Sequence, residues 1–393
     1  MTCQATGHES PGNSVDSSPD SEPRDTTAEA LSLDLSRQLR ALSVALGEEL
    51  APRAAIYLDT CYWVHLRDAL QGSADLRMRE LLGRLRAAVQ AGQAFCPVSE
   101  STIFELLKQS DPDTRHATAQ LMDELSAGVA IAGGQDRMGT ELAHFIHTHL
   151  PANIAKDLHP LRNLVWIRVA AVMGIRVPYL PEMTPDQAMD LQRSVVKRLW
   201  RDLSLDDLLA HQSHGFEDDD FASVTRQMNV DVAAHQAELR SFQHAYRLEA
   251  AGAADLCGDV VMQIVADVAA QHGQTAEALG TEPWRRMRAS WCHLLAEALR
   301  KGPSRDQLRS MHAMAALHAA FRWNAGQQFE PNDLYDFEHA TAALAHCQAF
   351  FTERPLWHAV TAGNVALDKH FGCDVVWKVD DALAVVANLA RRS

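Results

Sequence analysis

The chain has 393 residues, a hydrophobic share of 47%, a charged share of 22% and a formal net charge of −15. This composition is typical of a soluble globular protein, and no apolar run approaches the roughly 20 residues that span a bilayer. The negative charge disfavours a protein that holds nucleic acid on a broad cationic face, because phosphate contacts dominate such binding. A metal site built from carboxylates would add negative charge that the bound metal cancels.

The cysteines indicate a reducing compartment. There are seven of them, scattered without paired spacing and mostly within apolar runs. This is typical of reduced thiols rather than of a disulfide framework or a zinc module. The first residues contain neither a basic stretch nor an apolar core, so we expect no secretory signal and a cytoplasmic protein.

The chain begins with a polar segment and then alternates between apolar strands and helices. Residues 1–28 are rich in Ser, Pro, Asp and Thr, which predicts a disordered tail. Leucines recur at helical spacing in 29–52, which predicts an amphipathic helix ended by Pro52. Residues 53–134 form the first half of an α/β domain, with strands expected at 54–59, 94–98 and 128–132 and helices at 78–89, 101–109 and 113–126. Ser101 is a candidate N-cap, and the alternation implies a parallel sheet covered by helices.

Residues 135–310 differ from their surroundings. They are rich in Ala and Leu and lack strand-like alternation, which predicts an all-helical insertion. The α/β alternation resumes in 311–393, with helices expected at 333–345, 355–371 and 381–391 and strands at 349–351 and 374–379. Asp333 is the expected N-cap of helix 333–345. The fold class is therefore α/β, with one domain interrupted by helices.

Four acids lie at the boundaries of these elements, and they are Asp59, Glu105, Asp336 and Glu353. Two of them directly follow strands, at the positions that point into the crevice where α/β sheets bind ligands. Converging carboxylates are stable only if they hold hard cations such as Mg²⁺ or Mn²⁺. Such a group matches the needs of two-metal phosphodiester hydrolysis, in which one ion activates water and the other stabilises the leaving oxygen.

The order of these motifs resembles the PIN-domain (PilT N-terminus-like) ribonuclease superfamily. The motifs are a strand followed by Asp59-Thr60, a helix with Glu105, the helix segment 336–343, and a strand followed by Thr352-Glu353. The resemblance covers 54–134 and 311–393. It implies a three-layer α/β/α sandwich with a central parallel sheet, here interrupted by the insertion. It also implies that the four acids are catalytic and ligate Mg²⁺ or Mn²⁺, with supporting roles for Thr60, Asp333, His339 and Thr352.

The sequence departs from the family pattern, and each motif residue also has a structural interpretation. Cys61 stands where the family usually has Asn, and Glu353 replaces an Asp and follows Thr352 without a spacer. Asp59 could cap the next helix, and Glu105 could pair with Lys108. His339 could be a packed core histidine, and Glu353 a plain loop acid.

The insertion carries two further patterns. Glu141-x-x-His144 is half of a di-iron carboxylate motif, and the second half would have to come from another helix, with Asp113-x-x-His116 and Asp336-x-x-His339 as candidates. Basic clusters at 285–288 and 300–301, with Trp284 and Trp291 nearby, would either contact a phosphate backbone or be ordinary helix surface.

The sequence predicts a metal-dependent endonuclease that hydrolyses phosphodiester bonds, with RNA favoured over DNA as its nucleic-acid partner. A second hypothesis is a catalytically silent PIN-like scaffold that binds RNA or a protein, motivated by Cys61, Glu353 and the acidic charge. A helical di-iron enzyme is the third. No membrane partner is expected. The insertion is a candidate interface for a homo-oligomer, and a protein inhibitor is left open.

Overall fold

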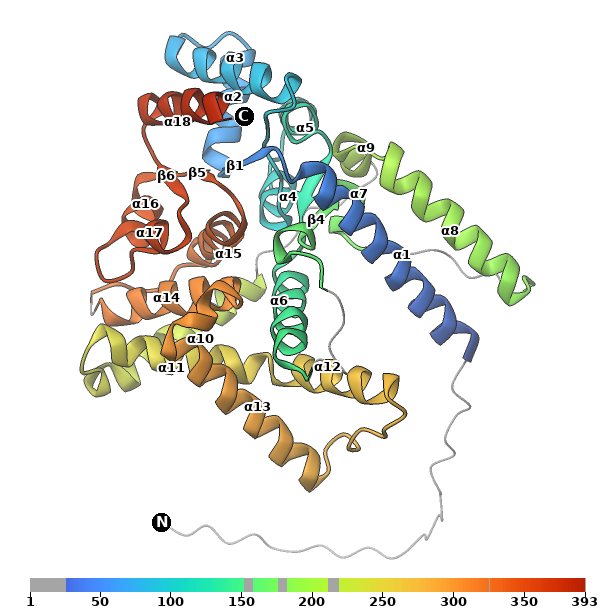
Figure 1. Ribbon diagram of the computed structural model, residues 1–393. Coiled ribbons are helices and arrows are strands. Elements are labelled where there is room, and N and C mark those ends of the chain that lie inside the picture. The colour runs from blue at the N-terminus through green and yellow to red at the C-terminus, as the bar shows by residue number, and fades with distance from the viewer. Residues whose placement is uncertain (1–25, 152–157, 176–181, 211–218, 325, 393) are drawn as a thin grey trace, which may run out of the picture.

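The computed structural model describes residues 26–151, 158–175, 182–210, 219–324 and 326–392 (Figure 1). Helices make up most of these residues and surround a small parallel sheet, which confirms the predicted mixed α/β class. None of the described helices is both long and apolar enough to cross a membrane. The expected tail 1–28 falls almost wholly outside the described residues, and its last three residues belong to the first helix.

The main sheet has four parallel strands in the order β2-β1-β5-β6. Their bounds are Ala54–Leu58 for β1, Ala94–Phe95 for β2, Ala349–Phe351 for β5 and Asp374–Val376 for β6. Leu58 lies opposite Phe351 in the β1–β5 register. Since β2 lies on one side of β1 and β5 on the other, the winding of the chain reverses between β1 and β5. Open α/β sheets bind ligands at such a switch point, beyond the carboxyl ends of the strands.

Alternating side chains of the strands divide the interior into two cores. Tyr57 and Phe350 belong to one core, and Ile56 and Phe351 to the other. The second core contains α2 (Thr60–Leu70), α3 (Leu76–Gln90), α4 (Glu100–Leu107), α5 (Pro112–Ser126) and α18 (Val379–Arg392). The first contains α14 (Arg309–Trp323) and α15 (Pro331–His346). Helices therefore cover both faces of the sheet, with α2, α3 and α18 on one side and α14 and α15 on the other (Figure 1).

The predicted third strand is β3 (Val129–Ile131), but its pairing is mixed. Val98 and Ala130 form one parallel bridge that joins it to the chain after β2. On its other side, β3 pairs antiparallel with β4 (Trp166–Arg168). The Trp166 ring packs on Phe95 with the ring centroids 5.1 Å apart. The prediction that 135–310 is wholly helical was wrong, because this three-residue strand is too short to show an alternating pattern.

Several predicted ends and caps were also wrong. The expected helix 355–371 is two helices, α16 (Arg354–Thr361) and α17 (Leu367–Phe371), and the expected strand 374–379 stops at Val376. Helix α4 is capped by Ser99, whose side chain accepts from the Thr102 N–H, and not by Ser101. The N-cap of α15 is Glu330 and not Asp333. Asp333 lies in the first turn of the helix, where its carboxylate accepts a hydrogen bond from the Glu330 N–H at 2.7 Å. Helix α2 was not predicted.

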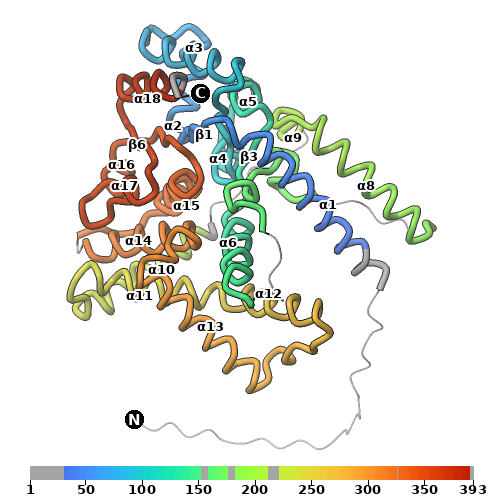
Figure 2. The backbone as a smooth tube through the Cα atoms, in the orientation of Figure 1, coloured from blue at the N-terminus to red at the C-terminus, as the bar shows by residue number. Residues whose placement is uncertain are grey.

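The remaining helices form an N-terminal arm and the insertion. The arm is α1 (Thr26–Leu50), which packs beside α8 (Pro185–Asp202), as Figure 2 shows. The Gln192 amide donates to the Leu31 carbonyl at 2.9 Å across this contact. The other insertion helices are α6 (Gly134–His149), α7 (Val169–Val172), α9 (Leu205–Ala210), α10 (Asp219–His235), α11 (Phe242–Leu256), α12 (Gly258–Gln271) and α13 (Glu282–Lys301), with 3₁₀ turns at Leu161–Asn163, Gln236–Glu238 and Pro303–Asp306.

A buried carboxylate ties the insertion to the sheet domain. Glu141 of α6 is fully buried and accepts from the backbone N–H of Ser310 at 2.9 Å and from its hydroxyl at 2.8 Å. It therefore satisfies the amino end of α14 from another helix. His346, at the end of α15, lies 3.2 Å from the same carboxylate. Glu141 is thus a structural residue that joins three helices, and this role argues against Glu141 as a ligand of a di-iron site.

His312 of α14 makes a second such link. Its Nδ1 lies 2.9 Å from the hydroxyl of Tyr246 on α11, and its ring contacts His370 of α17. Burial, with smaller effects from His370 and Arg305, lowers the pKa of His312 to about 3. The imidazole is therefore neutral in the folded protein at pH values where the unfolded chain is already protonated.

We expect this histidine to make stability depend on pH. The folded pKa is depressed, so its stabilisation is present above about pH 6.5 and is lost as the pH falls toward 3, by about 1.4 kcal/mol per pH unit. His312→Gln should flatten the fall in unfolding free energy between about pH 7 and about pH 4, measured by urea denaturation. The exposed His272, changed to Gln, is the matched control. Equal pH slopes for both variants would contradict this assignment.

Candidate metal site

Asp59 lies at the switch point of the sheet. Its backbone N–H donates to the Phe351 carbonyl at 2.9 Å, so the β1–β5 pairing continues to this residue. Its Oδ1 accepts from the Thr60 N–H at 2.7 Å and caps α2, and its Oδ2 accepts from the Thr352 hydroxyl at 2.6 Å. The capping interpretation of Asp59 is thus correct, and the carboxylate is also buried, at 5% exposure.

Glu105 approaches the same point from α4. Its carboxylate accepts from the Thr60 hydroxyl and lies 2.7 Å from His339 Nε2. His339 is fully buried, and its Nε2 also lies 4.0 Å from Asp59 Oδ1. Lys108 is the partner of Glu105 that the sequence offered as an alternative. Its ammonium lies 3.8 Å from the centre of the Tyr335 ring.

A chain of polar side chains holds His339 from behind. Its Nδ1 lies 2.6 Å from the hydroxyl of Tyr57, and that hydroxyl lies 2.6 Å from Ser99 Oγ. Ser99 in turn contacts Thr102 at 3.1 Å. Tyr57 is two residues before Asp59 and so points to the same face of the sheet. This spacing could have indicated Tyr57 from the sequence, whereas nothing local to Ser99 indicates the contact.

The Glu105–His339 contact is an ion pair. Burial opposes the charge on Glu105, but hydrogen bonds from His339 and Thr60 outweigh burial and hold its pKa below the ordinary value. Burial also opposes the charge on His339, yet Tyr57 and the carboxylates of Glu105 and Asp59 hold its pKa well above the ordinary value. The imidazole is therefore a cation placed between two acids.

Asp336 and Glu353 complete an acidic neighbourhood. Burial and then repulsion by Asp59 raise the pKa of Asp336 to about 7, and His339 offsets only part of this. Partial burial of its carboxyl group and repulsion by Asp59 and Glu105 also raise the pKa of Glu353, although the residue as a whole is exposed. The charge of Asp59 thus raises the pKa of both acids, but neither acid belongs to the close group formed by Asp59, Glu105 and His339.

The close group could hold a metal ion. Asp59, Glu105 and His339 each offer a ligand atom, and these atoms lie within 4.8 Å of one another. Carboxylate oxygens with one imidazole suit Mn²⁺, and carboxylates alone suit Mg²⁺. Across the described ranges this is the one such group of His, Cys, Asp and Glu, so Glu141 and His116 do not form the di-iron site considered from the sequence. His339 was expected only to support the site.

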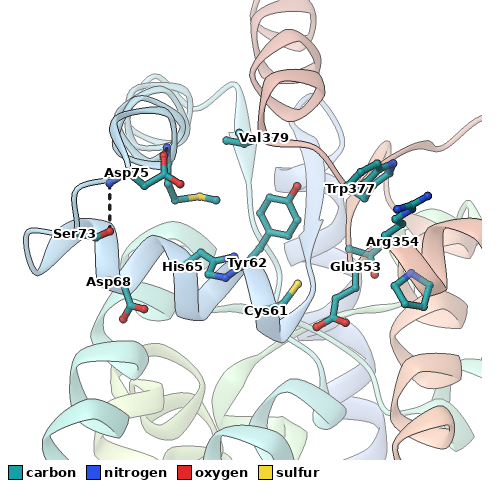
Figure 3. Close-up of a pocket in the computed structure, with 13 residues that line it drawn as sticks. Cys61, Tyr62, His65, Asp68, Ser73, Asp75, Glu353, Arg354, Trp377 and Val379 are labelled. Carbon is teal, nitrogen blue, oxygen red and sulfur yellow. Dashed lines mark hydrogen bonds between the residues drawn. The ribbon is translucent and has the colours of Figure 1, made fainter.

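A pocket of about 510 Å³ adjoins the acids (Figure 3). Its lining includes Glu353, Cys61 and Thr352, and the Thr352 hydroxyl also donates to Asp59. Burial and repulsion by Asp59 raise the pKa of the Cys61 thiol, so it stays protonated. Cys61 therefore contributes a neutral group where the family pattern has an amide.

The basic clusters of the insertion are compensated by acids. Arg285 and Arg286 both pair with Glu282, and Arg288 pairs with Asp255 and Asp259. Arg300 pairs with Glu297. These contacts favour the helix-surface interpretation over a phosphate-binding face.

A scan against protein-family models found no match, and searches of curated proteins and of solved structures found none either. The resemblance to PIN-domain ribonucleases therefore stays a prediction from the sequence motifs.

Asp336 should destabilise the metal-free protein. Its folded pKa is raised to about 7, so the stabilisation by the protonated acid is present below about pH 4 and is lost as the pH rises through 7. At about pH 8, Asp336→Asn should raise the unfolding free energy by about 2–4 kcal/mol. The variant should also gain less stability from Mn²⁺ than the wild type, measured by thermal unfolding with and without the ion.

Asp374→Asn is the matched control for this variant. Asp374 is exposed and begins β6, at the sheet edge opposite to the acids. We expect it to leave both the stability and the Mn²⁺ effect unchanged. A destabilised Asp336→Asn protein would show that the carboxylate is a structural partner rather than an uncompensated acid.

Proposed function

We propose that the protein is a metal-dependent endonuclease that hydrolyses phosphodiester bonds, with RNA favoured over DNA. One observation carries the proposal: Asp59, Glu105 and His339, from three distant segments, place ligand atoms within 4.8 Å of one another at the switch point of a parallel sheet. Burial, followed by repulsion from Asp59, raises the pKa of the nearby Asp336 to about 7. Proteins retain such unfavourable charge where a function needs it.

The proposed roles follow from the contacts. Asp59 and Glu105 would hold a divalent cation, and His339 would join them as a ligand after its imidazolium releases the Nε2 proton. Asp336 and Glu353 would hold a second cation or balance its charge from the rim of the site. When bound, divalent ions activate water as a nucleophile and stabilise the leaving oxygen. Thr60 and Thr352 orient the carboxylates of Glu105 and Asp59, so the donors are positioned before a cation arrives.

The resemblance to PIN-domain ribonucleases supports RNA as the substrate. Helices on both faces of a parallel sheet agree with the family's three-layer sandwich, which stays part of the proposal. The free thiols of the six described cysteines agree with a cytoplasmic location. A homo-oligomer through the insertion also stays a proposal, and the exposed Leu256 and Leu279 are the surface leucines that support it.

The scaffold hypothesis has one observation in its favour. The His339 imidazolium already pairs with Glu105, so this pair needs no metal to balance its charge. A silent PIN-like scaffold that binds RNA or a protein would keep this pair in every state. The two hypotheses therefore differ in whether the site takes up a cation and cleaves RNA.

A cleavage assay separates them. We expect the wild type to cut single-stranded RNA in the presence of Mn²⁺ or Mg²⁺ and to be inactive after chelation with EDTA. Asp59→Asn should reduce the cleavage rate at least about 100-fold, because it removes a charged ligand from the close group. The measurement is the rate of product formation on a gel with excess enzyme.

Asp374→Asn serves again as the control and should cleave at the wild-type rate. Equal rates for wild type and Asp59→Asn would show a contaminating nuclease. Absence of cleavage by the wild type with either metal, on RNA and on DNA, would reject the nuclease and favour the scaffold.

A further inference from the structure

The pocket beside the acids has the size and the walls of a nucleotide site. It lies between α2 and the segment that follows β6, and its volume of about 510 Å³ falls within the range of small-molecule sites. Figure 3 shows Tyr62 in its centre, with Trp377 and Arg354 on one side and Ser73 and Asp75 on the other.

The Tyr62 hydroxyl lacks a partner. The residue is 3% exposed, and within the described ranges nothing hydrogen-bonds to its oxygen. Its ring is fixed against Phe351 of β5, with the centroids 5.6 Å apart. Figure 3 shows the hydroxyl pointing into the pocket, toward the space between Val379 and Trp377. A buried hydroxyl without a partner is unfavourable, and a ligand with a polar edge would supply the partner.

Burial also determines what the hydroxyl offers to a ligand. It raises the pKa of Tyr62, so the phenol keeps its proton and can donate as well as accept. The carbonyl, amino and ring-nitrogen groups on the edge of a nucleobase are suitable partners for such a group.

The wall made by Trp377 combines an aromatic surface with positive charge. Trp377 is partly exposed, and the Arg354 guanidinium lies 5.3 Å and the Lys378 ammonium 5.0 Å from the centre of its ring. Aromatic rings with adjacent cations are the usual platform for unpaired bases and their phosphates. Three carboxylates also line the pocket, those of Asp68, Asp75 and Glu353, so these two cations mark the side on which a phosphate would lie.

We propose that this pocket binds one unpaired nucleotide of single-stranded RNA next to the phosphate to be cut. The base contacts Trp377 and hydrogen-bonds to the Tyr62 hydroxyl, and Arg354 faces the nucleotide's phosphate. The proposal rests on the proposed function for the position of the scissile bond, because Thr352 and Glu353 belong to both the pocket and the acidic site. It adds a requirement for an unpaired base.

Binding without cleavage provides the test. The full-length Asp59→Asn protein is titrated into a short fluorescein-labelled single-stranded RNA and into a duplex of the same sequence, and fluorescence anisotropy gives each Kd. Adding Trp377→Ala should weaken single-strand binding by about 5- to 100-fold. Adding Tyr62→Phe should weaken it by about 3- to 10-fold, because only the hydroxyl is lost. Duplex binding should change by less than about twofold, because paired bases are not free to stack on Trp377.

Two variants control for unfolding. Trp377→Phe keeps an aromatic wall and should recover most of the affinity. Trp323→Ala removes a tryptophan that is 39% exposed at the end of α14, outside the pocket, and should leave the Kd unchanged.

The outcomes separate this inference from the nuclease proposal. Selective loss of single-strand binding in Trp377→Ala and Tyr62→Phe supports the pocket even if the wild type cleaves nothing. Unchanged Kd values in both variants overturn the pocket even if the wild type cleaves RNA. Equal weakening on single strand and duplex, or no RNA binding by the parent protein, also overturns it.

Discussion

The site depends on the pairing of β1 with β5 at the centre of the sheet. The two strands are separated by 290 residues of chain, from 59 to 348, yet the Asp59 N–H and the Phe351 carbonyl continue their ladder by one more hydrogen bond. That bond places Asp59 beside Thr352, whose hydroxyl fixes the carboxylate. Without this register the acids of the two halves would lie at different depths of the sheet.

The insertion does not disturb this register because it is anchored at both of its ends. Glu141 joins α6 to the amino end of α14 and approaches the last turn of α15. Helix α15 also carries Asp336 and His339, so the anchor and the site share one rigid element. Helix α14 packs against α15 in the first core, and this packing fixes the insertion relative to the sheet.

The electrostatics of the site are a compromise between folding and chemistry. Burying carboxylates together is unfavourable, and the fold reduces that cost with hydroxyl donors, the amino end of α2 and the His339 imidazolium. The compensation is incomplete, as the raised pKa values of Asp336 and Glu353 indicate. A cation supplies the missing positive charge in the proposed function, and the neighbouring cations of Arg354 and Lys378 favour a substrate phosphate.

The sequence predicted well those features that depend on local pattern. The apolar runs before Asp59 and Glu353 specified β1 and β5, and the acids after them marked the edge at which they meet. Features that depend on distant contacts could not be predicted. The ion pair of His339 with Glu105 joins residues 234 positions apart, and strand β4 is stabilised by pairing with β3 rather than by its own periodicity. Likewise, the sequence around the start of α15 did not indicate that its N-cap is Glu330 rather than Asp333.

The central claim is that Asp59 and Glu105 share a divalent cation. The most direct measurement is anomalous X-ray diffraction from crystals of the full-length protein soaked in Mn²⁺. We predict a peak within coordination distance of both carboxylates, about 2.2 Å from each nearest oxygen. An unchanged Glu105–His339 contact with no anomalous peak between Asp59 and Glu105 would contradict the account.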